Sequence, residues 1–117
     1  MIMANPLPIN TLKGTLGELL VQLRLLEYGV QAAPPLKDSG NDLIGIKGRV
    51  IKLIQVKTEM RLRDLPNIYD LVAIVNLEYD ENNNLLLDQS RIWLIKNNES
   101  LNKKRELNQS LVDEIWR

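Results

Sequence analysis

The chain has 117 residues, a formal net charge of zero, no cysteine and no histidine. This length suits one domain that buries roughly two-thirds of its unfolded surface. The lack of cysteine excludes disulfides and thiolate metal sites, and the lack of histidine excludes Ser-His-Asp catalysis, Cys-His catalysis and histidine-bound zinc. Catalysis would therefore have to use carboxylate, lysine, amide or hydroxyl groups.

We expect residues 1–117 to form a single domain, because no repeat, low-complexity tract or linker divides the chain. The opening segment MIMANPLPIN has no positively charged region, and no stretch of about 18 apolar residues occurs. This pattern predicts a soluble cytoplasmic protein without a membrane partner. Zero net charge argues against a nucleic-acid partner. However, residues 1–63 carry nine Lys/Arg and five Asp/Glu (+4), while residues 64–117 carry six and ten (−4), so the first half is basic.

The first predicted element is a helix over residues 11–28. Its leucines recur at helical spacing, and Gly29 follows as a natural stop. The stripe consists of leucines 12, 16, 19, 20, 23 and 26. Val21 and Leu25 lie away from this stripe, and a helix with two apolar faces usually buries the second one against a partner. We therefore expect a homodimer or a higher homo-oligomer.

The later elements are mainly strands. A short extended segment at 30–33 runs into Pro34-Pro35 and a polar loop, and two strands follow at 42–47 and 50–58. The remaining expectations are a poorly formed helix near 62–68, strands in YDLVAIVNLEY and RIWLIK with a turn at ENNN between them, and a last helix over 101–116. This order predicts an α/β fold with one sheet and helices packed against it.

The register of the hairpin between 42–47 and 50–58 decides which polar residues meet. Gly48-Arg49 has the Gly-X order of a two-residue type II′ turn, which places Asp42 opposite Gln55. A three-residue loop over 47–49 would place Asp42 opposite Ile54 and mix apolar with charged positions, so the first register is favoured. It gathers four polar residues at one end of one face: Asp42, Gln55, Lys57 and Glu59.

Asp42, Gln55 and Lys57 could then converge on one point, because cross-strand neighbours lie about 5 Å apart and diagonal neighbours about 7–8 Å apart. Carboxylate and amide oxygens are hard ligands that suit Mg²⁺, which is usually held by few protein groups and substrate phosphate. A lysine beside them can orient a water or stabilise negative charge on a reacting phosphate. The pattern therefore indicates a candidate site for metal-assisted phosphate chemistry.

The segment KGTLGELLVQLRLLEYGVQAAPPLKDSGNDLIGIKGRVIKLIQVKTE resembles the PD-(D/E)xK nuclease superfamily. It is similar to archaeal Holliday-junction resolvases and, through QVKT, to the small endonucleases encoded in group I introns. The resemblance covers about residues 10–60, and YDLVAIVN and RIWLIK continue it loosely. It implies a restriction-endonuclease-like core, with a central mixed β-sheet flanked by helices in the order α-β-β-β-α-β. It also implies a DNA endonuclease that depends on Mg²⁺, with Mn²⁺ as an alternative.

The resemblance implies roles for individual residues. The catalytic residues would be Glu18, Asp42, Gln55 and Lys57, and the metal ligands would be Asp42, Glu18, Gln55 and the main-chain carbonyl of Val56. Lys57 would position or activate the attacking water. Asn41 stands where the superfamily normally has proline, and Gln55 stands in the position of the second acid. The residues expected to contact DNA are Lys13, Lys47, Arg49, Lys52, Arg61 and Arg63.

Each of these residues also has a structural interpretation. Glu18 fits a capping box that begins at Thr15. Asp42 could close an Asx-turn in SGND, and Gln55 and Lys57 could form the solvated end of an edge strand. Two other function classes stay open: a nuclease-fold module that binds nucleic acid or protein without cutting, and a structural partner whose acidic C-terminal half docks another subunit.

Overall fold

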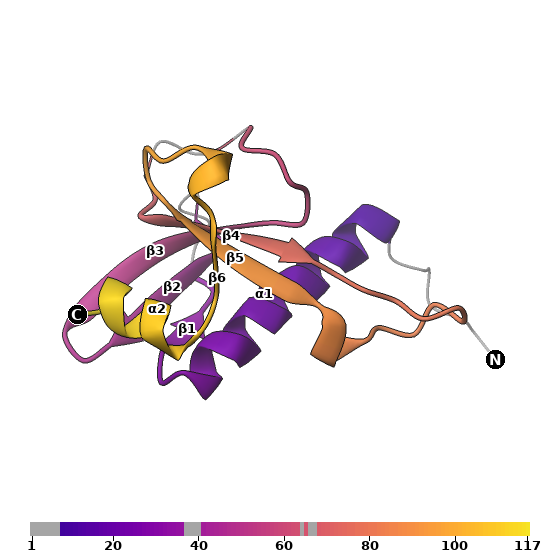
Figure 1. Ribbon diagram of the computed structural model, residues 1–117, viewed down its shortest axis with the longest axis horizontal. Helices are drawn as coiled ribbons and strands as arrows, with labels where there is room; N and C mark the ends of the chain where they lie inside the picture. The colour runs from indigo at the N-terminus through magenta and orange to yellow at the C-terminus, as the bar shows by residue number, and fades with distance from the viewer. Residues whose placement is uncertain (1–7, 37–40, 64, 66–67) are drawn as a thin grey trace.

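The computed structural model describes residues 8–36, 41–63, 65 and 68–117. They form a mixed six-stranded sheet with two α-helices and two short 3-10 helices (Figure 1). The strands are β1 (Gln31–Ala33), β2 (Leu43–Lys47), β3 (Val50–Lys57), β4 (Leu71–Asn76), β5 (Arg91–Lys96) and β6 (Arg105–Glu106). The helices are α1 (Ile9–Glu27), η1 (Leu87–Gln89), η2 (Leu101–Lys103) and α2 (Gln109–Ile115).

The strands lie across the sheet in chain order, and only β3 and β4 pair in parallel. A parallel pair needs a crossover connection of about a dozen residues or more, which residues 58–70 supply. The helix predicted near 62–68 is not formed at the described positions 62, 63, 65 and 68. Positions 64, 66 and 67 of that prediction lie outside the described residues. The connection instead contributes Leu62, Leu65 and Tyr69 to a small core on one face of the sheet.

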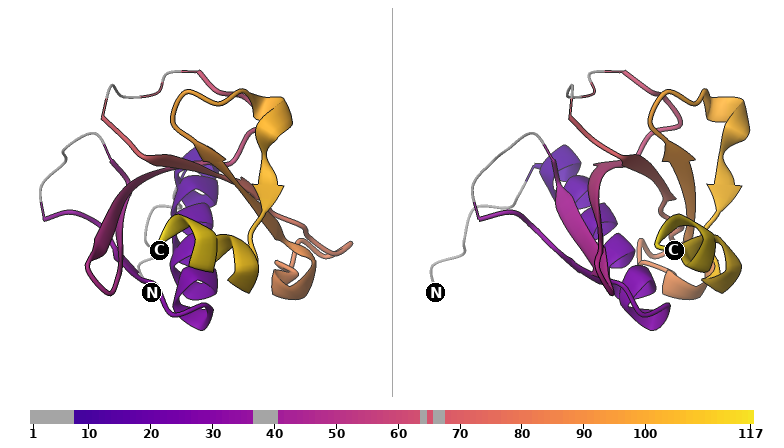
Figure 2. Two further views of the ribbon diagram at one scale, coloured as in Figure 1. Left: turned by 60° about the vertical axis from the view of Figure 1, so that its left-hand side comes forward. Right: turned by 90° about the vertical axis from the view of Figure 1, so that its left-hand side faces the viewer.

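The main core lies on the opposite face, where α1 and α2 both pack (Figure 2). Helix α2 is much shorter than the helix predicted over 101–116, because the chain first forms η2 and then β6. Asn108 caps the N-terminus of α2, and its side-chain oxygen accepts a hydrogen bond of 2.8 Å from the Leu111 N–H. Trp116 follows α2 in the core, 4% exposed, and its indole N–H donates to the Gly45 carbonyl at 3.1 Å.

Helix α1 buries a different face against the sheet from the one that the sequence predicted. Its buried residues are Gly17, Leu20, Val21 and Leu25, so the two residues that we assigned to a second face belong to the core. The leucine stripe mostly faces outward; Leu19, for example, is 55% exposed. Gly17 explains the choice of face, because its missing side chain lets the helix approach β3 closely. The helix ends as predicted, with Gly29 at a φ of +89°.

The predicted hairpin register is confirmed. Residues 43–47 of β2 pair with residues 54–50 of β3, with Ile46 opposite Ile51. Gly48 has a φ of +62°, as the first position of a type II′ turn requires. The register brings the start of β2 alongside the end of β3. The connection 58–70 leaves from this end of the strands.

Candidate functional site

Asp42 lies one residue before β2 and bonds to β3 through both its backbone and its side chain. Its N–H donates to the Ile54 carbonyl at 3.1 Å, and its Oδ2 accepts from the Val56 N–H at 2.8 Å. The strand pairing ends at Leu43 opposite Ile54, so the predicted pair of Asp42 with Gln55 is not part of the ladder. The carboxylate accepts the hydrogen bond that a backbone carbonyl of β2 would accept from Val56 if the ladder continued. This bond anchors the Asp42 side chain at the centre of the Gln55–Lys57 segment.

Glu18 reaches the same place from α1. Its pKa is raised, first because the carboxyl is partly buried, then because the negative charge of Asp42 is near and because the two carboxyls share a hydrogen bond. The close packing of Gly17 on β3 sets this position, since a Cβ on Gly17 would lie 2.8 Å from Thr58 Cγ2. The capping-box interpretation of Glu18 is wrong, because α1 begins at Ile9 and Thr15 lies in its interior.

Gln55 and Lys57 lie on a central strand, which excludes the edge-strand interpretation. Side chains alternate along a strand, and α1 packs on the face of Ile54 and Val56. Gln55 and Lys57 therefore face the side of the sheet away from α1 and Glu18. A site that joins Glu18 to Gln55 and Lys57 predicts that all three share one side, and that prediction is wrong. The in-plane carboxylate of Asp42 is the group that connects the two sides. Gln55 Oε1 is buried and has no hydrogen-bond partner among the described residues.

Asn41 is a residue whose importance the sequence did not reveal. It is 7% exposed, and its Oδ1 is also buried without a hydrogen-bond partner in the described part of the chain. Buried polar atoms normally have partners, so two orphaned amide oxygens near one carboxylate are unusual. The only sequence signal was a polar residue immediately before Asp42, at the position where the resemblance leads one to expect proline.

A basic hollow adjoins the site. It has a volume of about 280 Å³ and is lined by Val56, Lys57, Thr58, Glu59, Arg61 and Arg63. Glu59 forms ion pairs with Arg61 at 3.0 Å and with Arg63 at 3.8 Å. Lys57, Arg61 and Arg63 make this hollow a suitable place for a phosphate next to the carboxylates.

Three of the other basic residues expected to contact DNA are not brought to this site. Lys47 pairs with Asp113 of α2 at 2.8 Å, and Lys52 lines a different pocket with Asp70 and Glu114. Arg49 lies in the hairpin turn, about 26 Å from Lys57 at 3.3 Å per strand residue. Lys13 lies on α1, five residues before Glu18.

The residues present fit a single hard cation. No group of three or more acidic side chains suited to a metal occurs among the described residues, so two carboxylates and neutral oxygens would have to suffice. Two buried oxygens without partners, on Asn41 and Gln55, are of the type that Mg²⁺ prefers. The Val56 carbonyl points to the same side of β3 as its N–H, and therefore toward Asp42.

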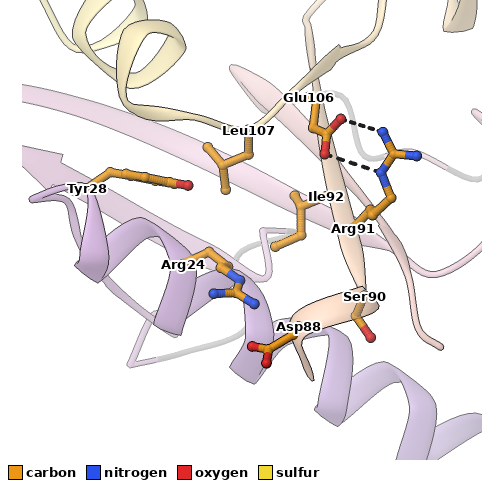
Figure 3. Close-up of a pocket in the computed structure, with 8 residues that line it drawn as sticks. All are labelled: Arg24, Tyr28, Asp88, Ser90, Arg91, Ile92, Glu106 and Leu107. Atoms are coloured by element: carbon orange, nitrogen blue, oxygen red, sulfur yellow. Dashed lines mark hydrogen bonds and ion pairs between the residues drawn. The ribbon is translucent and has the colours of Figure 1, made fainter. Parts of the chain in front are cut away.

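A larger pocket than the basic hollow lies elsewhere, between α1, η1 and β6. It has a volume of about 310 Å³ and is lined by the eight residues drawn in Figure 3. Three of its charged side chains are engaged with protein partners: Arg91 Nε donates to Glu106 at 3.2 Å, and Arg24 donates to the Leu87 carbonyl at 2.9 Å. Size alone therefore does not mark the functional site. Within the described ranges, no helix has the length and apolar composition needed to cross a membrane.

The architecture of sheet, helices and hairpin is nuclease-like. No protein-family model and no curated protein matches the chain. Among solved structures, the chain is similar to the bacterial homing endonuclease I-Ssp6803I, with a TM-score of 0.50 and 14% sequence identity over 86% of this chain and 79% of that one. The chain therefore shares its mixed α/β fold with that endonuclease.

Proposed function

We propose that the protein is a metal-dependent endonuclease that hydrolyses phosphodiester bonds in DNA. The observation that carries the proposal is the Asp42 carboxylate, which accepts a hydrogen bond from the Val56 N–H at the end of β3, close to Glu18 of α1, whose pKa is raised by partial burial and by the charge of Asp42. This arrangement concentrates negative charge and oxygen ligands at the end of β3, beside a lysine and two arginines. The fold shared with a bacterial homing endonuclease supports the same function.

Asp42, Glu18, Gln55 and the Val56 carbonyl would hold the ion, which we expect to be Mg²⁺, with Mn²⁺ as an alternative. A bound Mg²⁺ supplies Lewis-acid polarisation of the phosphate and lowers the pKa of a bound water. Gln55 contributes a neutral oxygen that is already buried and unpartnered among the described residues, so binding it costs little further desolvation.

Lys57 would position the attacking water or take its proton. Lys57 follows the residue that anchors Asp42 and lines the basic hollow, and both features support this role. Arg61 and Arg63 line the same hollow and would hold the phosphates that flank the scissile bond. Glu59, which pairs with both arginines, would have to share or release them when DNA binds.

The test combines metal binding and cleavage. Wild-type protein should bind Mg²⁺ or Mn²⁺ by calorimetry and cut plasmid, linear duplex, single-stranded or branched DNA when either ion is present. Lys57→Ala should retain metal binding but lose cleavage by about 10²-fold or more, the scale for removing a proton-transfer group. Gln55→Glu should bind the ion more tightly and still cut, because a carboxylate also supplies the oxygen.

A binding module that does not cut DNA is the second candidate, favoured by the neutral Gln55 and by the two carboxylates, no more, that the described residues bring to the site. In that case neither variant changes hydrolysis. Lys57→Ala then weakens DNA binding and lowers the salt dependence of that binding by the equivalent of about one phosphate contact. Wild-type protein that neither cuts any of these substrates nor binds either ion would refute the endonuclease.

A further inference from the structure

The outward face of α1 carries an apolar stripe that the described chain leaves largely exposed, with Leu16 partly buried. We call it the leucine seam; it consists of Ile9, Leu12, Leu16, Leu19, Leu23 and Leu26. Exposure is 61% at Ile9, 55% at Leu19 and 62% at Leu26. The seam is about 26 Å long at 1.5 Å per helical residue. A continuous apolar stripe of this length on a protein surface marks an interaction site.

The spacing within the seam identifies the kind of partner. Steps of three and four residues alternate without a break, which is the heptad pattern that lets helices pack side by side in a coiled coil. The order of steps is 3-4-3-4-3, so the pattern is the same in both directions. A second copy turned end for end would therefore present the same seam in register.

We propose that the leucine seam pairs with the same seam of a second copy in antiparallel orientation. The central register places Leu12 opposite Leu23 of the second copy, and Leu16 opposite Leu19 of the second copy. Each apolar position then meets another apolar position, which is the self-complementary contact of a twofold dimer. This pairing does not depend on the proposed endonuclease activity.

Charges beside the seam favour the antiparallel orientation. Lys13 and Glu27 lie on the same flank, each next to a seam leucine and fourteen residues apart. In the antiparallel register, Lys13 of each chain lies about 7.5 Å along the axis from Glu27 of the other, a gap that two long side chains can span. Glu27 also pairs with Arg24 of its own chain at 3.1 Å, so it would be shared between the two cations. In a parallel pair, Glu27 would instead face Gln22 and Lys13 would face Pro8. A net charge of zero does not oppose association of two copies.

Mass measurement tests the interface. Light scattering at micromolar concentration should give at least twice the 13.4 kDa of one chain, and Leu19→Glu should halve the wild-type mass. Ile51→Glu is the matched control, since Ile51 is 58% exposed on the hairpin, away from α1. Its mass should match that of the wild type. A monomeric wild type, as expected if residues 1–7 cover the seam within one chain, or an unchanged mass for Leu19→Glu, would overturn the interface.

Cross-linking tests the orientation and does not rely on a disruptive variant. The chain has no cysteine, so each introduced thiol reports only its own position. The double variant Leu12→Cys/Leu23→Cys should form a covalent dimer on oxidation. Each single variant should not, because the introduced cysteine and the same cysteine of the second copy lie about 16 Å apart along the helix axis. Efficient cross-linking of the single variants, as a parallel pair would give, or none by the double variant, would overturn the antiparallel pairing.

Discussion

Two glycines of α1 test how tightly the helix packs on the sheet. A Cβ on Gly17 would lie 2.8 Å from Thr58 Cγ2, closer than side chains tolerate, whereas a Cβ on Gly14 meets nothing within 4 Å. Thr58 is β-branched and short, so it cannot easily move aside. Both substitutions to alanine gain about 1 kcal/mol of helix propensity. Only Gly17→Ala overpacks the contact, at a cost of about 1–3 kcal/mol.

The difference between Gly14→Ala and Gly17→Ala cancels the propensity gain and isolates the contact. We expect Gly14→Ala to unfold at a higher urea concentration than the wild type, and Gly17→Ala to be less stable than Gly14→Ala by about 1–3 kcal/mol. Thr58→Ser removes the methyl group involved, so adding it to Gly17→Ala should recover part of the loss relative to Thr58→Ser alone. Equal stabilisation by both alanines would refute the close approach of α1 to β3, and with it the placement of Glu18.

Three further outcomes concern the site and the core. The pKa of Glu18 is raised in the folded metal-free protein, so between the two pKa values the folded protein holds a proton that the unfolded chain has released. The free energy of unfolding should therefore fall as pH rises from the ordinary value of 4.5 through the raised folded value. Glu18→Gln should flatten this part of a series of urea unfolding curves against pH, and an unchanged slope would count against the Glu18–Asp42 contact. Asp42→Ala leaves the Val56 N–H without its acceptor and should lower the free energy of unfolding by about 1–3 kcal/mol. Asp42→Asn keeps an acceptor, so it should lose metal affinity with little loss of stability. Equal urea midpoints for the two variants would contradict this. Trp116→Phe removes the bond to the Gly45 carbonyl and should lower the free energy of unfolding by a similar amount, about 1–3 kcal/mol, so a wild-type urea midpoint would show that this bond is dispensable.

The hairpin and the strands were predictable because their information is local. Gly48 fixes the turn, and the turn fixes the register, so the sequence alone could place Asp42 beside β3. RIWLIK forms β5 over the predicted residues. The last helix was overpredicted because part of that segment forms β6 by pairing with β5, and helical spacing carries no information about that pairing.

The inward face of α1 could not be predicted from hydrophobicity. The exposed stripe is richer in leucine than the buried face, and the buried face is selected by the absence of a side chain at Gly17. The same limit applies to the site. The sequence suggested that Asp42, Gln55 and Lys57 share one face, but it could not show that Asp42 would leave the strand ladder and bond in the plane of the sheet.

The parallel pairing of β3 with β4 has a consequence for how the protein folds. It divides the sheet into two antiparallel meanders, β1–β3 and β4–β6, each made of contacts between consecutive strands. Contacts close in sequence form faster than distant ones, so each meander can form before the two join. Glu18, Asp42 and Lys57 all belong to the first half of the chain, so their geometry can be assembled early. Docking of Trp116 against Gly45, which closes 71 residues of chain, would then come late and secure the two halves.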